Sequence, residues 1–167
     1  LQMNFSLDAV ESNIASQIAG VKSYKVKHVQ EMIIYAAKKM KLIVAPVLIP
    51  GLNEDQMDKI IEFVAELPHV TLGIQNYLSY KTGRNAGKSL PWSKFYSLLE
   101  EWEKKHNIKL KLQKEDFGIR KTKDLEKPFE TNERVMAILK CPGRFIDSSI
   151  AVADDRNISV SDCKFVK

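Results

Sequence analysis

The first 113 residues show two kinds of hydrophobic pattern in turn. Residues 42–49 are apolar throughout apart from Pro46, and so short a continuous apolar run is typical of a strand buried on both faces. Residues 53–67 instead place apolar side chains three and four positions apart, which is typical of a helix with one buried face. The order of these patterns predicts an α/β fold.

Strands and helices are expected to alternate along this part of the chain. The predicted strands are residues 2–7, 42–49, 70–75 and 108–112, and the predicted helices are 8–20, 26–40, 53–67 and 89–107. Strands separated by helices of this length favour a parallel sheet with βαβ crossovers. Four such strands amount to half of a parallel β/α barrel, so a partial barrel is the expected architecture.

Cap residues set the expected helix ends. Asp8 is predicted to cap the first helix, and Gly20 to end it in a left-handed conformation. Asn53 is predicted to cap the third helix, with Gln56 at capping-box spacing. Before Asn53, Pro50 and Gly51 make a sharp turn where a ligand or a backbone could come close.

The hydrophobic periodicity is lost after residue 113. Residues 114–127 are charged and aperiodic, and they are interpreted as a linker. Residues 128–167 are expected to form a small β-barrel module with strands at 134–139, 149–152 and 157–160. Pro142-Gly143 and Asp154-Asp155 supply the turns between them. Residues 1–113 are therefore one expected domain and 128–167 a second.

Composition narrows the class of protein. Apolar residues make up 44% and charged residues 28% of the 167 positions, as in an ordinary globular protein, and no segment is long and apolar enough to suggest a membrane span. Two cysteines, Cys141 and Cys163, do not make a disulfide scaffold, so the cytoplasm is the expected compartment. Because Leu1 already lies in a strand pattern, the chain is expected to be part of a longer or split protein.

Charge is concentrated in the middle of the chain. Residues 80–127 carry thirteen lysines and arginines against seven acidic residues, whereas the whole chain has a net charge of +5. Such a basic segment is compatible with an anionic partner such as RNA. Such a segment is more often an ordinary solvated surface, and the sequence leaves both readings open.

Polar residues follow each of the first three predicted strands. The carboxyl ends of parallel strands share one rim, where ligands bind in α/β folds. Neutral polar groups and one carboxylate there suit hydrogen bonds to a ribose, an adenine edge or an amino-acid moiety. Each residue taken alone also fits turn chemistry or helix capping. The residues of this predicted rim are Ser6, Asp8, Pro50, Gly51, Asn53, Gln75 and Asn76.

An aromatic and basic segment follows the third predicted strand. Aromatic rings that alternate with cations can stack on a nucleotide and neutralise its phosphates, although a solvated loop fits equally well. The residues considered for substrate or phosphate binding are Tyr77, Tyr80, Lys81 and Arg84. No Cys/His pattern in the chain has the spacing of a metal site.

Taken in order, several motifs resemble the radical SAM superfamily. Residues 4–8 (NFSLD) and 45–54 (APVLIPGLNE) resemble the second half of the barrel in molybdenum cofactor biosynthesis protein A and its relatives. A closer resemblance is to archaeal predicted iron–sulfur oxidoreductases of this superfamily, through residues 43–47, 72–77 with Gly83-Arg84, and 115–119. Residues 142–144 with 155–156 resemble that family's TRAM or OB-like C-terminal module.

The resemblance implies S-adenosylmethionine (SAM) and a [4Fe–4S] cluster as cofactors. It places Ser6 and Asp8 near the methionine or ribose part of SAM, Asn53 with Pro50-Gly51 near the ribose or adenine, and Gln75 with Asn76 near the adenine. The family's Cys-x-x-x-Cys-x-x-Cys cluster motif is absent from this chain. An N-terminal half of the barrel, in the same protein or in a split partner, is therefore the expected partner, and the chain alone is expected to be inactive.

Two further readings remain open. The chain could be an RNA-binding or RNA-modification-associated module that uses its basic middle and C-terminal barrel. It could instead be a subunit whose exposed sheet edge pairs with a partner chain.

Overall fold

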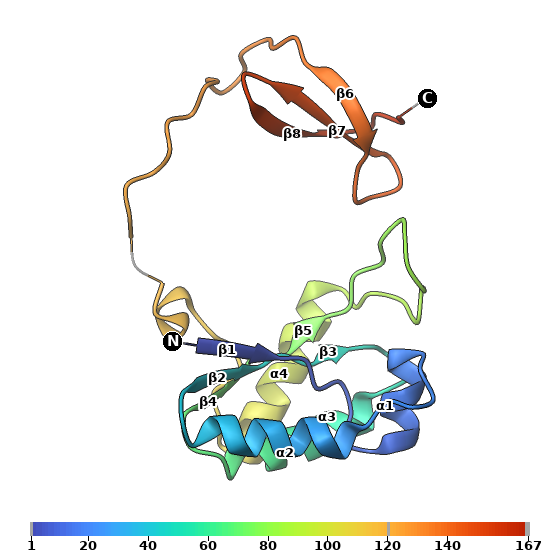
Figure 1. Cartoon of the computed structure of the whole chain (residues 1–167), viewed down its shortest axis with the longest axis vertical. Helices are drawn as coiled ribbons and strands as arrows, with labels where there is room; N and C mark the ends of the chain where they lie inside the picture. Colours follow the sequence, from blue (N-terminus) through green and yellow to red (C-terminus); the bar gives the residue numbers. More distant parts are fainter. Residues whose placement is uncertain (1, 120, 166–167) are drawn as a thin grey trace. The chain divides into compact units, whose positions relative to one another are not determined.

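The computed structural model describes residues 2–119 and 121–165 and divides the chain into two compact units (Figure 1). The first unit contains residues 2–79 and 86–119, and the second contains 80–85 and 121–165. Residues 114–119, expected in a linker, therefore belong to the first unit. The loop at 80–85 groups with the C-terminal segment.

The first unit is built on parallel strands that follow chain order. β1, β2 and β4 form one sheet in that order, and β3 and β5 pair beyond it as continuations of β2 and β4. The Gly73 amide donates to the Val44 carbonyl at 2.9 Å, so the ladder bridges the interruption. These strands are β1 (Gln2–Phe5), β2 (Lys41–Val44), β3 (Val47–Leu48), β4 (Val70–Leu72) and β5 (Gln75–Asn76).

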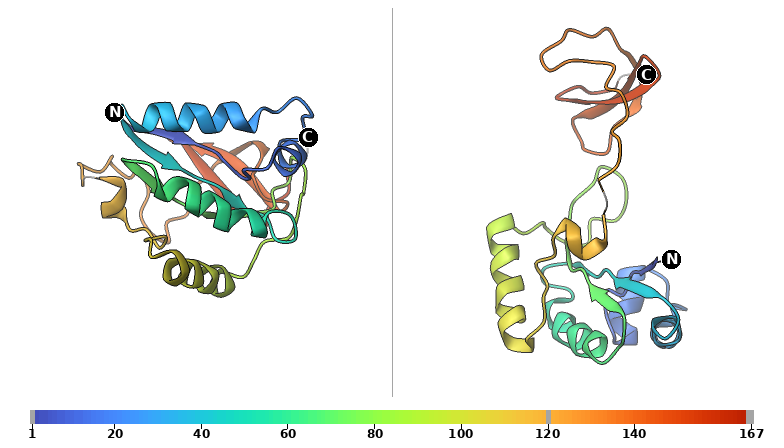
Figure 2. Two further views of the ribbon diagram at one scale, coloured as in Figure 1. Left: turned by 90° about the horizontal axis from the view of Figure 1, so that it is seen from below. Right: turned by 90° about the vertical axis from the view of Figure 1, so that its left-hand side faces the viewer.

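Helices connect the strands and pack on the sheet. They are α1 (Ser12–Ala19), α2 (Val26–Ala37), α3 (Glu54–Ala65) and α4 (Trp92–His106), with a 3-10 turn, η1, at Lys114–Phe117. α2 and α3 run along the same face of the sheet (Figure 2). None of the helices in the described residues is long and apolar enough to cross a lipid bilayer.

The core lies between that face and the helices. Leu42 and Val44 of β2 are almost fully buried, as are Ile33 of α2 and Ile60 of α3. Because side chains alternate along a strand, Ile43 points to the opposite face, beside Asn4 of β1 in the strand register. That opposite face is not packed against α2 or α3 and is called the uncovered face below, although Ile43 on it is only 8% exposed.

The predicted strand at 108–112 is wrong. The amides of Leu110 and Lys111 donate to Glu103 Oε1 at 2.6 and 2.8 Å instead of to a neighbouring strand. The Glu103 carboxylate thereby ties the segment back to α4, and both bonds lower its pKa. The alternation of apolar and polar residues at 108–112 carries no information about the Glu103 carboxylate as a hydrogen-bond acceptor. The sheets of the described residues are small and none is closed into a barrel.

The predicted cap of the first helix is wrong, and the predicted cap of the third is confirmed in position only. α1 begins at Ser12, so Asp8 lies too far upstream to cap it. Asn53 does occupy the cap position of α3, but its side chain makes no capping hydrogen bond. The predicted helix ends are confirmed, since Gly20 and Asn107 follow α1 and α4 with φ of +70° and +50°.

The second unit is an antiparallel sheet of three strands in the order β6-β7-β8. Asp154 and Asp155 join β7 to β8 with φ of +44° and +55°, which confirms the predicted turn. Ala151 is the one fully buried apolar residue among the described positions of this unit. The strands are β6 (Ile138–Pro142), β7 (Ser148–Ala153) and β8 (Arg156–Ser161).

Candidate functional site at the carboxyl ends of the parallel strands

Asn53 ties together the loops that follow β1 and β3. Its Nδ2 donates to the carbonyl of Asp8 at 2.7 Å and to that of Val47 at 2.9 Å. Its Oδ1 accepts from the amide of Ile49 at 2.7 Å. The side chain is fully buried. Both of its N–H donors and its carbonyl oxygen are already hydrogen-bonded within the chain. Asn53 therefore positions the rim rather than offering atoms to a ligand.

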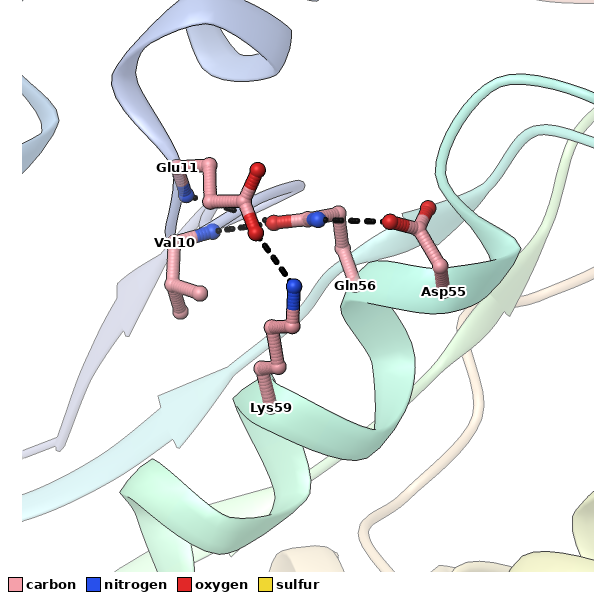
Figure 3. A network of polar contacts seen from close by, with 5 residues as sticks. All are labelled: Val10, Glu11, Asp55, Gln56 and Lys59. Atoms are coloured by element: carbon pink, nitrogen blue, oxygen red, sulfur yellow. Dashed lines mark hydrogen bonds and ion pairs between the residues drawn. The ribbon is translucent and has the colours of Figure 1, made fainter.

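Gln56 of α3 makes a second link to the loop that follows β1, as Figure 3 shows. Its Oε1 accepts from the amides of Val10 and Glu11, both at 3.2 Å, and its Nε2 donates to Asp55 at 2.9 Å. One helical turn further along α3, Lys59 forms an ion pair with Glu11. Gln56 is also fully buried, and this role differs from the predicted capping box.

The Asp8 carboxylate is the charged group at the centre of the rim. Its Oδ1 accepts from the amide of Val47 at 2.7 Å, which joins the β1 loop to β3. Burial raises the pKa of Asp8 above its usual value, and the bond from Val47 only partly offsets that rise. A carboxyl with a raised pKa beside a cavity is a recognised feature of functional sites.

Ser6 and Asp8 line a cavity of about 250 Å³ next to α1. The apolar part of its wall is made of small residues and one isoleucine, and Tyr24 completes the lining. Burial raises the pKa of Tyr24, and the charge on Asp8 raises it further. The cavity thus offers a hydroxyl, a phenol and a carboxylate, a set that can bind a ligand hydroxyl or ammonium group.

The Pro50-Gly51 turn lies exposed beside this network. Gly51 has a φ of +76°, a value that favours glycine, and its amide donates to Glu54 at 2.9 Å. A side chain placed on Gly51 would meet nothing within 4 Å, so glycine is needed here for backbone conformation. Gly51 is exposed at this turn, as the predicted close approach of a ligand or a backbone requires.

Gln75 and Asn76 differ in their surroundings. Asn76 is nearly buried, donates to the carbonyl of Leu90 at 2.9 Å and accepts from its amide at 3.4 Å. It therefore holds the loop between β5 and α4. Gln75 is exposed and lines a groove on the uncovered face of the sheet. Of this predicted pair, Gln75 is the residue free to meet a ligand.

The aromatic and basic segment divides between the units. Tyr77 belongs to the first unit, where its hydroxyl accepts from the amide of Ala86 at 3.1 Å. Tyr80, Lys81 and Arg84 belong to the second unit. There the guanidinium of Arg144 lies 3.8 Å from the centre of the Tyr80 ring and also hydrogen-bonds to its hydroxyl.

Arg144 entered the sequence analysis only as part of the motif at 142–144 and was not among the residues considered for substrate or phosphate binding. It lies 64 positions from Tyr80, so local spacing carried no signal of the pairing. Tyr24 and the loop-binding role of Gln56 were missed for the same reason, because each depends on contacts between distant loops.

The chain does not fit a [4Fe–4S] cluster. Cluster ligation needs several thiolates at close spacing, and both cysteines, Cys141 and Cys163, lie in the second unit. Among the described residues no group of three or more His, Cys, Asp or Glu side chains could hold a metal ion. The donors at the rim suit SAM better, since Ser6 and Asp8 can bind its hydroxyl or amino groups.

The chain is similar to an uncharacterized protein of Methanocaldococcus jannaschii, MJ0103. The two are 29% identical over 185 aligned residues, which cover 97% of this chain and 43% of that protein. The chain thus spans less than half the length of this relative, whose name states no activity. No family model and no solved structure matches the chain.

Proposed function

We propose that the chain is the C-terminal part of a cytoplasmic radical SAM iron–sulfur oxidoreductase and that it contributes part of the SAM and substrate site. The proposal is supported by the rim, where parallel strands in chain order end in loops that carry Ser6, Asp8 and the Pro50-Gly51 turn. It also rests on the ordered series of motifs that resemble this superfamily. Three sequential parallel strands are compatible with part of a β/α barrel.

In this proposal the residues of the chain bind and orient the cofactor. Ser6 and Asp8 would hydrogen-bond to the amino-acid or ribose part of SAM from the cavity beside α1. Asn53 and Asn76 would act indirectly by holding the loops in place, and the Pro50-Gly51 turn would border the ribose or adenine. Cleavage of SAM at a reduced cluster supplies the radical chemistry in this superfamily.

The cluster ligands would come from a segment outside these 167 residues. Because this chain lacks the cysteine motif, we expect it to bind SAM weakly and not to cleave it. The partner required is an N-terminal half of the barrel, in the same protein or in a separate chain.

Anaerobic reconstitution of the longer protein tests this proposal. The coding sequence upstream of Leu1 should contain Cys-x-x-x-Cys-x-x-Cys, and the purified protein should take up iron and sulfide. Incubation with SAM and a reductant should then release 5′-deoxyadenosine. A protein that binds no cluster, or that leaves SAM intact when the cluster is present, would contradict the proposal.

RNA binding by the second unit is a second candidate function. The observation that favours it is the stack of Arg144 on Tyr80, with Phe145 6.0 Å from the same ring. Phe145 is 55% exposed, and the Lys81 amide donates to the Arg144 carbonyl at 3.2 Å, so the two segments that carry these cations and rings lie side by side. Such a group can stack on unpaired bases and contact phosphates.

Replacing Arg144 by alanine should weaken binding of a single-stranded RNA oligonucleotide about tenfold, since loss of one stacking contact costs about 1–3 kcal/mol. Filter binding across a salt series measures both the affinity and the number of phosphate contacts. Arg156→Ala is the matched control, because Arg156 is an exposed arginine at the other end of the sheet. Equal affinities for the two variants, or an affinity independent of salt, would argue against RNA binding here.

A further inference from the structure

The uncovered face of the parallel sheet forms the floor of a groove of about 680 Å³. The floor is contributed by Asn4, Ile43 and Gln75, with Ala45 and Gly73 between them. One wall comes from α4 and the other from the segment that follows it, including Leu112 and Phe117. A volume of this size is typical of small-molecule sites.

The groove is open because two positions of its floor are occupied by the smallest residues, alanine and glycine. Ala45 and Gly73 lie side by side in the continued strand register, where larger residues would fill the space. A Cβ atom on Gly73 would lie 3.6 Å from the Leu112 side chain, in ordinary contact. The cavity therefore results from the choice of residues and not from a backbone constraint.

Aromatic rings of α4 line one side of the groove. Trp92 and Tyr96 are 54% and 48% exposed, although both are large rings. Their centroids lie 6.1 Å apart and their planes differ by 32°, while Phe95 packs against each of them edge-on. Phe95 is buried and fixes the two exposed rings, which leaves their faces available for stacking on a planar group.

Two polar side chains of the groove floor, Asn4 and Gln75, are amides without a hydrogen-bond partner among the described residues, whereas the Asn76 amide in the lining is bonded to Leu90. Lys111 is the one charged residue in the lining, and its ammonium is paired with Glu100 at 2.6 Å. A neutral surface with free amide donors and acceptors complements an uncharged polar edge better than a cation or a carboxylate.

We propose that this groove binds an uncharged planar aromatic ring of the substrate. The ring would stack on Tyr96, beside Trp92, and its edge groups would hydrogen-bond to Asn4 and Gln75. Both a pyrimidine base and a phenol or aromatic amide present this chemistry. The assignment to a substrate rests on the proposed function, whereas the binding of such a ring depends only on the groove.

NMR titration of the full 167-residue chain tests the site without cluster or reductant. Uridine and 4-hydroxybenzamide are the two probes, and they separate a nucleobase from a phenol-type source. Binding should shift the side-chain amide signals of Asn4 and Gln75 and the indole N–H signal of Trp92. Saturable signal shifts with one probe alone identify whether the groove takes a nucleobase or a phenol-type ring. If neither probe shifts these signals, the proposal is overturned.

Tyr96→Ala should weaken binding of the probe about tenfold, because the substitution removes the ring on which the planar group stacks. Tyr35→Ala is the matched control: Tyr35 is a helix-surface tyrosine of similar exposure, 58%, on α2, and it is not among the groove residues. Equal loss in both variants, or loss in neither, would contradict the site.

Competition with SAM separates substrate from cofactor. If the groove serves the substrate, added SAM should leave the probe signals in place. Displacement of the probe by SAM would assign the groove to the cofactor and overturn the substrate proposal. Failure of the longer protein to cleave SAM would instead count against the proposed function, and it would leave the binding of the ring intact.

Discussion

Replacing Asn53 by alanine should lower the free energy of unfolding of the first unit by about 3 kcal/mol. The substitution removes a fully buried side chain and leaves the amide of Ile49 and the partly buried carbonyls of Asp8 and Val47 without their partner. Each buried polar group left unpaired costs about 1–3 kcal/mol, and entry of water would recover part of the total.

Urea unfolding followed by tryptophan fluorescence measures this loss. Both tryptophans, Trp92 and Trp102, belong to the first unit, so the signal reports that unit. Gln75→Ala is the matched control, because the exposed Gln75 amide should change stability by no more than about 0.5 kcal/mol. A similar midpoint for Asn53→Ala and the control would show that the three hydrogen bonds do not hold the rim together.

Hydrophobic pattern was enough to predict most elements of the first unit. The helices at 26–37, 54–65 and 92–106 lie where the three-and-four spacing placed them. The predicted strand at 108–112 does not form, because the Glu103 carboxylate of α4 accepts from the amides of Leu110 and Lys111 in place of a neighbouring strand. Periodicity describes burial, and it carries no information about which acceptor a backbone amide finds.

The sequence indicated where the residues of the candidate site lie, but not which of them face a ligand and which hold the loops in place. Ser6, Asp8 and Gly51 lie at the predicted rim with atoms free for a ligand or with backbone exposed. Asn53 and Asn76 lie there too, but their side-chain amides already hydrogen-bond to backbone carbonyls 6 to 45 positions away in the sequence. An asparagine after a strand suits either role, and only long-range contacts decide between them.

Asp8 connects the stability of the fold with its proposed function. Its folded-state pKa is raised above the unfolded value, so its protonated form contributes stability at low pH. That contribution is complete below the unfolded pKa and is lost as the pH rises through the folded pKa. At neutral pH the ionised carboxylate therefore destabilises the first unit. A buried charge retained at such a cost is typical of a functional group.

Replacing Asp8 by asparagine should stabilise the first unit at about pH 7 and weaken SAM binding by the longer protein about tenfold. The amide oxygen can still accept from Val47, while the charge that burial disfavours is removed. A ligand hydroxyl or amino group loses a charged hydrogen-bond partner worth about 1.5–3 kcal/mol. Unfolding of the two proteins compared from about pH 3 to pH 7 should show the gain appearing as the pH rises. Gln17→Ala, at an exposed position of α1, is a control that should change neither property. A variant with less stability at neutral pH, or with unchanged SAM affinity, would show that Asp8 serves the fold alone.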